Sequence, residues 1–257
     1  MRLAVISDIH GNLAALEAVL DDLAALGGAD MTWCLGDLAT FGPRPAACIR
    51  RVKMLAEADD GQTFKVIGGN TDRYLVTGER MPTPPAPDEA AMYQRAADWS
   101  VRDRLLNWGL SQLDFSDYSY LQTILGRELA LEAPGFGRVI GYHAVPGDDE
   151  AMLLPETPDE QARDYLLDRE GRLAVGGHIH RQMDRDLGGW RAINVGSVGL
   201  SFETPGLAQW GLFTFEDGRL TVDLRRIAYN LEAVVEDLQT AGHPAPDWFS
   251  SRLRPTA

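Results

Sequence analysis

The sequence of 257 residues has few cysteines and no long hydrophobic run. Cys34 and Cys48 are the only cysteines and lack C-x-x-C spacing, so we expect buried reduced thiols and neither a disulfide framework nor a thiolate metal site. No apolar stretch approaches the ~20 residues that span a membrane. The segment before Asp8 is too short for the hydrophobic region of a signal peptide. We therefore expect a soluble, cytoplasmic protein with no membrane partner.

Positive charge is also scarce, because 24 Lys and Arg residues stand against 38 Asp and Glu residues, giving a net charge of −14 at pH 7. Proteins that bind nucleic-acid backbones in general need a basic face, so no such binding is expected. A phosphate substrate remains compatible with this charge, because bound divalent cations can dominate the local field of a site. The hydrophobic content of 45% is ordinary for a globular protein.

Strand and helix patterns alternate over the first 75 residues. Apolar runs at 3–6, 31–35 and 64–67 predict strands. Asn12 is a good helix N-cap before leucines at helical spacing, and a second helix is expected at about 45–58. This order is typical of βαβ units and predicts a largely parallel sheet.

The region from about 75 to 135 interrupts this rhythm. A proline-rich linker, 81–87, precedes a predicted helix at 88–113. The helix carries an apolar stripe that we interpret as helix-packing core, with a substrate cap or a dimer surface as the alternative. The stripe consists of Trp99, Leu105, Leu106, Trp108 and Leu113.

The α/β pattern resumes at Arg138, with strands ending at His143 and His178 and a helix at about 158–168 between them. Residues 190–195 and 209–227 are predicted strands, and Asp217-Gly218 forms a hairpin turn in the second. The last predicted helix runs from about 230 to 242, and the tail after His243 is expected to be irregular and to bind no metal.

Five of the apolar runs are followed by side chains that can bind metals. At the carboxyl edge of an open α/β sheet such side chains meet in one site. Imidazole, carboxylate and amide ligands suit Mn, Fe, Zn, Ni or Mg rather than a thiophilic metal. Each motif taken alone could have a purely structural role, such as that of a histidine buried in the core. Together the motifs predict a metal centre. The residues are Asp8, His10, Asp37, Asn70, His143, His178 and His180.

In this order the motifs resemble the calcineurin-like metallophosphoesterase superfamily. They are Asp8-Ile9-His10, Gly36-Asp37, Gly69-Asn70-Thr71-Asp72, His143 and Gly177-His178-Ile179-His180. The segments 8–12 and 194–199 resemble its small bacterial and archaeal phosphodiesterase branch. The resemblance implies an α/β fold (α+β in some schemes), a four-layer αββα sandwich of two mixed β-sheets flanked by helices. It also implies a single domain, 1–257, with the helical insertion at about 75–135.

The resemblance further implies two divalent metal ions and the hydrolysis of a small phosphate ester. Asp8, His10, Asp37 and His180 would hold the first ion, and Asp37, Asn70, His143 and His178 the second. A hydroxide bridging the two ions would attack phosphorus in line, as in a phosphodiesterase. The alternatives are a diadenosine-polyphosphate type of nucleotide pyrophosphohydrolase, a phosphoprotein phosphatase, or a non-catalytic binding module on the same scaffold.

One position departs from the family pattern. Thr71 stands where many members have a histidine that protonates or stabilises the leaving group. A hydroxyl cannot act as a general acid near pH 7, so we expect esters with good leaving groups to be preferred, such as aryl or nucleotide diesters.

Three residues and one acidic segment near the motifs have less certain functions in the sequence. Asn12 is expected to contact substrate phosphate or simply to cap its helix, and Arg73 to bind phosphate or to remain a solvated surface charge. Asp72 is expected to orient the site loop. The acidic segment 148–150 is expected to be a solvated loop.

Overall fold

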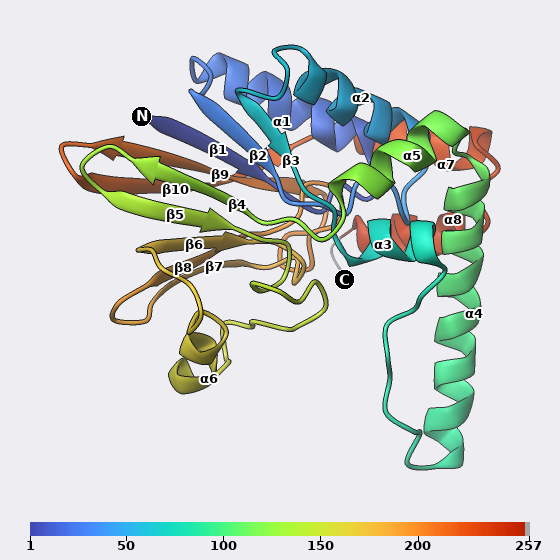
Figure 1. Cartoon of the computed structure of the whole chain (residues 1–257). Helices are drawn as coiled ribbons and strands as arrows, with labels where there is room; N and C mark the ends of the chain where they lie inside the picture. The colour runs from blue at the N-terminus through green and yellow to red at the C-terminus, as the bar shows by residue number, and fades with distance from the viewer. Residues whose placement is uncertain (255–257) are drawn as a thin grey trace.

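Two five-stranded sheets packed face to face form the body of the protein (Figure 1). The structure is a computed structural model and describes residues 1–254. The first sheet has the order β10-β9-β1-β2-β3 and the second the order β4-β5-β6-β8-β7. The first sheet contains β1 (Arg2–Ile6), β2 (Met31–Cys34), β3 (Phe64–Val66), β9 (Leu207–Glu216) and β10 (Arg219–Ala228). The second contains β4 (Leu129–Ala133), β5 (Gly137–Gly141), β6 (Leu173–Gly176), β7 (Gln182–Asp186) and β8 (Arg191–Val195).

Both sheets are mixed. Strands β1, β2 and β3 run parallel, whereas β9 and β10 are antiparallel to their neighbours. In the second sheet β5, β6 and β8 run parallel, and the edge strands β4 and β7 are antiparallel. The parallel centres match the βαβ pattern of the sequence, and the antiparallel edges come from short hairpin connections such as the turn at Asp217-Gly218. The implied sandwich of two mixed sheets is confirmed.

Strand β1 has no polar residue from Leu3 to Ile6 because both of its faces are buried. Leu3 and Val5 lie in the cluster between the two sheets, whereas Ala4 and Ile6 lie in the cluster between the first sheet and its helices. Alternate side chains of a strand point to opposite faces, so a strand buried on both faces has an unbroken apolar sequence. Cys34 and Cys48 are buried and free, as expected, and burial raises the pKa of both thiols.

Helices cover the outer faces of the sandwich, with α1 and α2 packed on the first sheet and α6 on the second (Figure 1). The helices are α1 (Leu13–Ala25), α2 (Pro45–Glu57), α3 (Asn70–Thr77), α4 (Glu89–Ser111), α5 (Phe115–Ile124), α6 (Asp159–Asp164), α7 (Leu231–Thr240) and α8 (Pro246–Arg252). The prediction of an irregular tail after His243 was wrong. Pro246 starts helix α8, and the side chains of Phe249 and Leu253 are buried in a hydrophobic cluster that holds this helix against the body.

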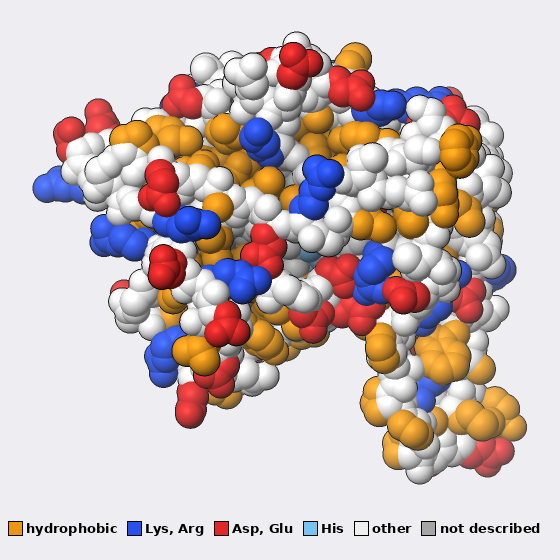
Figure 2. Space-filling model, in the orientation of Figure 1, with side chains coloured by type: hydrophobic (Ala, Val, Ile, Leu, Met, Phe, Trp, Pro, Cys, Tyr) orange, Lys and Arg blue, Asp and Glu red, His pale blue; other side chains and the backbone are white. Residues whose placement is uncertain are grey.

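Helix α4 projects from the body as an arm, and hydrophobic side chains cover part of the arm (Figures 1 and 2). Leu105 and Leu106 in its second half are buried, whereas Trp99 in its first half is 40% exposed. The predicted packing stripe is therefore confirmed only for the end of the helix next to the body. Among residues 1–254, no helix is long and apolar enough to cross a membrane.

Candidate metal centre

The loops that follow β1, β2 and β6 are tied together by hydrogen bonds that backbone amides donate. The Asp8 amide donates to the Gly36 carbonyl oxygen at 3.0 Å, and the His10 amide to the Asp37 carbonyl oxygen at 2.9 Å. The His178 amide donates to Oδ2 of Asp8 at 2.8 Å, which joins the two sheets at this edge. The carboxyl ends of strands from both sheets therefore meet in one place.

The backbone at these loops is strained. Five predicted ligands have positive φ angles: Asp8 at 57°, His10 at 50°, Asp37 at 57°, His178 at 71° and His180 at 54°. They are five of the eight non-glycine residues with this conformation in the described part of the chain. Such backbone costs about 1–3 kcal/mol per residue and concentrates where function needs a fixed side-chain direction. The strain thus coincides with the sequence motifs.

Asp8, His10 and His180 form a first group of potential ligands. Nε2 of His180 lies 2.9 Å from Nε2 of His10 and 3.2 Å from Oδ1 of Asp8. Oδ1 of Asp8 is buried and has no hydrogen-bond partner among the described residues. An orphaned carboxylate oxygen beside two imidazole nitrogens is the donor set that a divalent cation would satisfy.

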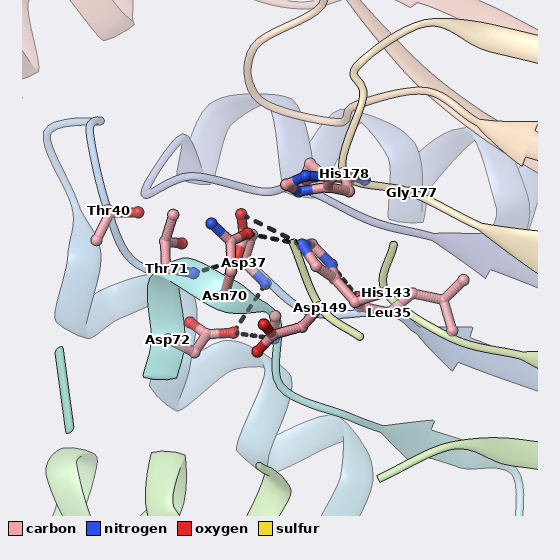
Figure 3. Close-up of polar contacts among 12 residues, drawn as sticks. Leu35, Asp37, Thr40, Asn70, Thr71, Asp72, His143, Asp149, Gly177 and His178 are labelled. Atoms are coloured by element: carbon pink, nitrogen blue, oxygen red, sulfur yellow. Dashed lines mark hydrogen bonds and ion pairs between the residues drawn. The ribbon is translucent and has the colours of Figure 1, made fainter. Parts of the chain in front are cut away.

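Asp37, Asn70 and His143 form a second group (Figure 3). Nε2 of His143 lies 3.0 Å from Oδ1 of Asn70 and 3.6 Å from Oδ2 of Asp37. The same Oδ2 atom lies 3.7 Å from Nε2 of His10 in the first group. One carboxylate oxygen of Asp37 therefore lies within 3.7 Å of a histidine nitrogen in each group.

Backbone carbonyls fix how the histidines present their lone pairs. Nδ1 of His143 lies 2.7 Å from the Leu35 carbonyl oxygen, and Nδ1 of His180 lies 2.6 Å from that of Leu200. A carbonyl only accepts, so each Nδ1 carries a hydrogen and each Nε2 faces the site, where its lone pair is the one that a metal ion would bind. Lone pairs that face carboxylate and amide oxygens repel one another unless a cation lies between them, so the residues fit metal ions.

His178 is oriented in the opposite way. Its Nε2 lies 3.2 Å from the Glu150 carbonyl oxygen, which leaves Nδ1 for a ligand. Burial lowers the pKa of His178 to about 4, so the ring is neutral at pH 7 as metal binding requires. Burial also disfavours the charged form of His143, but the negative charges of Asp37 and Asp8 outweigh it and raise the pKa of this ring. That negative field is what a cation would neutralise.

Two glycines allow the close approach of these groups. A Cβ atom at Gly69 would overlap the Asp37 carboxylate and the His143 ring. A Cβ atom at Gly177 would overlap the side chains of Ser7 and Asp8. The glycines of the two motifs therefore keep space at the centre of the site.

Asp72 is hydrogen-bonded to the loop that carries Asp37. Its carboxylate accepts hydrogen bonds from the backbone amides of Asp37 (2.8 Å), Leu38 (3.0 Å) and Gly69 (3.1 Å). The Thr71 amide donates to Oδ1 of Asp37 at 2.9 Å, while the buried Thr71 hydroxyl has no partner among the described residues. Asp37 is thus held on both sides, and the Thr71 hydroxyl is left free beside it (Figure 3).

Asn12 is a helix cap. Its Oδ1 accepts from the Ala15 amide at 3.1 Å, and its Nδ2 donates to the Gly199 carbonyl oxygen at 3.1 Å. Ser197 in the same loop donates from its hydroxyl to the Asp8 carbonyl oxygen at 2.7 Å. The side chain of Asn12 is therefore engaged within the chain, and the loop 194–199 supports the first group of ligands.

Arg73 lies in a cluster that sequence reasoning missed. Its guanidinium pairs with Asp149 at 2.7 Å, with Glu150 at 2.7 Å and also with Glu79; we call these four residues the Arg73 cluster. The prediction of a solvated loop at 148–150 holds for Asp148, which is exposed, but was wrong for Asp149 and Glu150, because both pair with this guanidinium. Arg73 is correspondingly neither a solvated charge nor an uncompensated phosphate ligand. The pairs with Asp149 and Glu150 join residues 76 and 77 positions apart, which no local pattern reveals.

The Arg73 cluster forms one wall of the site. It holds Glu150, whose carbonyl oxygen faces His178. A cavity of about 340 Å³ lies beside His143, and Arg73, Arg127 and Asp149 contribute to its lining. From this side, only a small area of histidine is visible, at the bottom of a hollow bordered by acidic and basic side chains (Figure 2).

The chain is similar in sequence or structure to several known proteins. A protein of Methanocaldococcus jannaschii described as uncharacterized is 26% identical, with 98% of this chain and 96% of that protein aligned. The crystal structure of a metallophosphoesterase from Sphaerobacter thermophilus superimposes with a TM-score of 0.71 at 23% identity, covering 98% of each chain, and thus shares the fold. A symmetrical bis(5′-nucleosyl)-tetraphosphatase of Chromohalobacter salexigens is 35% identical over 109 residues, which cover 42% of this chain and 37% of that enzyme.

The match to a family model is broader than that local similarity. The model of the calcineurin-like phosphoesterases matches residues 1–182, a range that includes all seven candidate ligands. With these motifs assembled at one edge of a two-sheet sandwich, the chain belongs to the calcineurin-like phosphoesterase family.

Proposed function

We propose that the protein is a dinuclear metal-dependent phosphodiesterase that acts on a small phosphate ester, built as a single domain over residues 1–257. One observation carries the proposal: Oδ2 of Asp37 lies within 3.7 Å of a histidine nitrogen in each of the two ligand groups. A carboxylate placed in this way suits two cations that share it. The orphaned Oδ1 of Asp8 and the inward lone pairs of His143 and His180 support the same assignment.

In this proposal the first ion is held by Asp8, His10, Asp37 and His180, and the second by Asp37, Asn70, His143 and His178. Divalent ions at such a site polarise the phosphoryl group and lower the pKa of bound water. Asp72 holds the backbone amide of Asp37, and the Thr71 amide donates to its carboxylate, so both help to position that carboxylate. The unpartnered Thr71 hydroxyl is available to hydrogen-bond a leaving oxygen but not to protonate it, so good leaving groups are favoured.

The local similarity to symmetrical bis(5′-nucleosyl)-tetraphosphatase supports a second candidate, the cleavage of dinucleoside polyphosphates. The metal centre would be the same, and the scissile bond would be a phosphoanhydride. The similarity covers 42% of this chain, so a substrate panel has to decide between the two.

The test is hydrolysis by metal-stripped protein reconstituted with Mn, Fe, Zn, Ni or Mg. The substrates are bis(p-nitrophenyl) phosphate, p-nitrophenyl phosphate and diadenosine tetraphosphate. We expect metal-dependent turnover that favours the diester and falls by more than about 10²-fold in Asp37→Ala, because the charge developing in the transition state loses its stabilisation. Arg80→Ala, which removes an ion pair with Asp103 on the arm, is the control.

Each alternative has its own outcome in this panel. Preference for the monoester would identify a phosphatase, and preference for diadenosine tetraphosphate the pyrophosphohydrolase. Tight binding of metal without turnover of any substrate would instead indicate a binding module on the same scaffold.

A further inference from the structure

A row of five aromatic rings crosses the site on the side of His10 and His180. Ring centroids are separated by 5.7 Å between Trp248 and Phe41, and by 5.1 Å between Phe41 and His10. The row continues with 4.7 Å between His10 and His180, and 4.5 Å between His180 and Phe202. We call Trp248, Phe41, His10, His180 and Phe202 the ring row. It connects two candidate metal ligands to three apolar side chains that the proposed metal centre does not use.

Phe202 is the exposed end of the ring row. Its ring stacks on the His180 imidazole with an interplanar angle of 29°, and its amide donates to the His180 carbonyl oxygen at 3.1 Å. The side chain is nevertheless 59% exposed. One face of the phenyl ring thus covers the imidazole, and much of the remaining surface is open to solvent beside the site.

Phe41 is fixed on the other side of His10 at a conformational cost. Its φ angle of 80° is unfavourable for a residue with a side chain. His243 holds this backbone, since its Nε2 lies 2.8 Å from the Phe41 carbonyl oxygen. Trp248 packs on the Phe41 ring, and the Arg252 guanidinium lies 3.7 Å from the Trp248 ring centroid on α8. The C-terminal helix therefore supports the position of Phe41.

We propose that the exposed ring of Phe202, backed by the ring row, binds a planar aromatic group that the substrate carries on its phosphate, either a nucleobase or an aryl ring. The inference deepens the proposed function and rests on it. An ester whose phosphorus lies between the two ligand groups has its substituents beside His180, on which the exposed Phe202 ring stacks. Aromatic side chains stack on any base because every base has a π-face.

The chemistry of the opposite wall supports this placement. There the Arg73 cluster carries three carboxylates for one guanidinium, so an aromatic group would have to displace or desolvate charges. On the side of the ring row the rings themselves present apolar surface. The aromatic substituent therefore fits the ring row better than the charged wall.

The test uses three diesters that all release p-nitrophenolate, with methyl, phenyl or thymidin-5′-yl as the second substituent. Because the leaving group is the same, differences in KM report the second substituent. For the metal-loaded wild type we expect a lower KM for the phenyl and thymidine esters than for the methyl ester. Phe202→Ala should raise the KM of the phenyl and thymidine esters about tenfold, because we assign to Phe202 the substituent that remains on phosphorus and a lost stacking contact weakens that substituent when it is aromatic. The methyl ester, whose p-nitrophenyl ring is the leaving group, should change much less.

Phe115→Ala is the matched control, because Phe115 is an exposed phenylalanine (81%) that stacks on Tyr118 of the same helix. A loss for both aromatic esters indicates a general aromatic site, and a loss for thymidine alone indicates a nucleobase site. Equal KM values for all three esters in the wild type, or an equal loss for all three in Phe202→Ala, would overturn the inference.

Turnover of the methyl ester, and its loss in Asp37→Ala, tests the proposed function separately. If no ester is hydrolysed, binding is measured instead. The Kd values of adenosine monophosphate and ribose 5-phosphate are determined for the metal-loaded wild type and for Phe202→Ala, and their ratio reports the contribution of the base. A ratio unchanged by Phe202→Ala would refute a role of Phe202 in binding aromatic groups.

Discussion

The two sides of the candidate metal centre are built from different chemistry. On one side the ring row places aromatic carbon against His10 and His180 and leaves Phe202 exposed. On the other side the Arg73 cluster engages its one cation with three carboxylates and holds the Glu150 carbonyl oxygen against His178. The charged side is internally satisfied, whereas the aromatic side has an open surface. Carbonyl oxygens position a candidate ligand on each side, Glu150 for His178 and Leu200 for His180, and under our proposal only the aromatic side also offers a surface to the substrate.

Thr71→His offers the largest expected change, because it adds a general acid to α3, the helix that also carries Arg73. The substituted imidazole titrates near neutral pH and can protonate a poor leaving group, so turnover of alkyl diesters should rise about 10²-fold or more relative to aryl diesters. The measurement is kcat for a methyl phosphodiester against bis(p-nitrophenyl) phosphate. Thr71→Asn, which cannot donate a proton in this way, is the control. An unchanged alkyl-to-aryl ratio would show that position 71 does not face the leaving group.

Arg73→Met should weaken the charged side without affecting the aromatic side. The three carboxylates of the Arg73 cluster would repel one another, and the loop of Glu150 would no longer fix the ring of His178. Loss of a partner that orients a ligand costs roughly 10–100-fold in metal affinity. We expect that loss for the more weakly bound ion in a calorimetric titration of the stripped protein.

The preference for thymidine over methyl esters should be unchanged in Arg73→Met, because Phe202 is on the opposite wall. Arg80→Met is the control, since the pair of Arg80 with Asp103 (2.9 Å) lies on the arm. Normal metal binding in Arg73→Met would mean that the Arg73 cluster is merely a surface ion-pair network. A changed ester preference would mean that the two walls are not independent.

The ligand motifs were predictable from sequence because they lie close to strand ends. The residues at the metal centre follow apolar strands within a few positions, so motif and strand end can be read together, as for Asp8 and His10. The mixed sandwich was predictable through the family resemblance, whereas the βαβ pattern alone indicated only a largely parallel sheet. A local sequence pattern is thus sufficient to predict a site residue when that residue lies in the loop directly after a strand.

The walls of the site depend on contacts between distant segments. Arg73 and Asp149 are 76 residues apart, and the Phe41 carbonyl oxygen meets His243 at a separation of 202 residues. No periodicity or motif links these partners, so the sequence alone favours a solvated Asp149 and an irregular tail after His243. Long-range pairing of charges and rings is set by the packed fold, and only the structure shows it.

Tyr74→Phe should have the smallest effect and would sharpen the comparison within the charged side. The Tyr74 hydroxyl donates to Oε1 of Glu150 at 2.5 Å, but Arg73 also binds that oxygen at 2.7 Å, so Glu150 keeps its main partner. We expect the free energy of unfolding in urea to fall by about 1 kcal/mol, with an unchanged m-value. Affinity for the weaker metal ion should fall only about twofold. Tyr118→Phe removes a comparable hydroxyl, which donates to the Val76 carbonyl oxygen at 2.9 Å, and should cost similar stability with no change in metal binding. If the two variants bind metal equally, Tyr74 contributes to the stability of α3 but not to the orientation of His178.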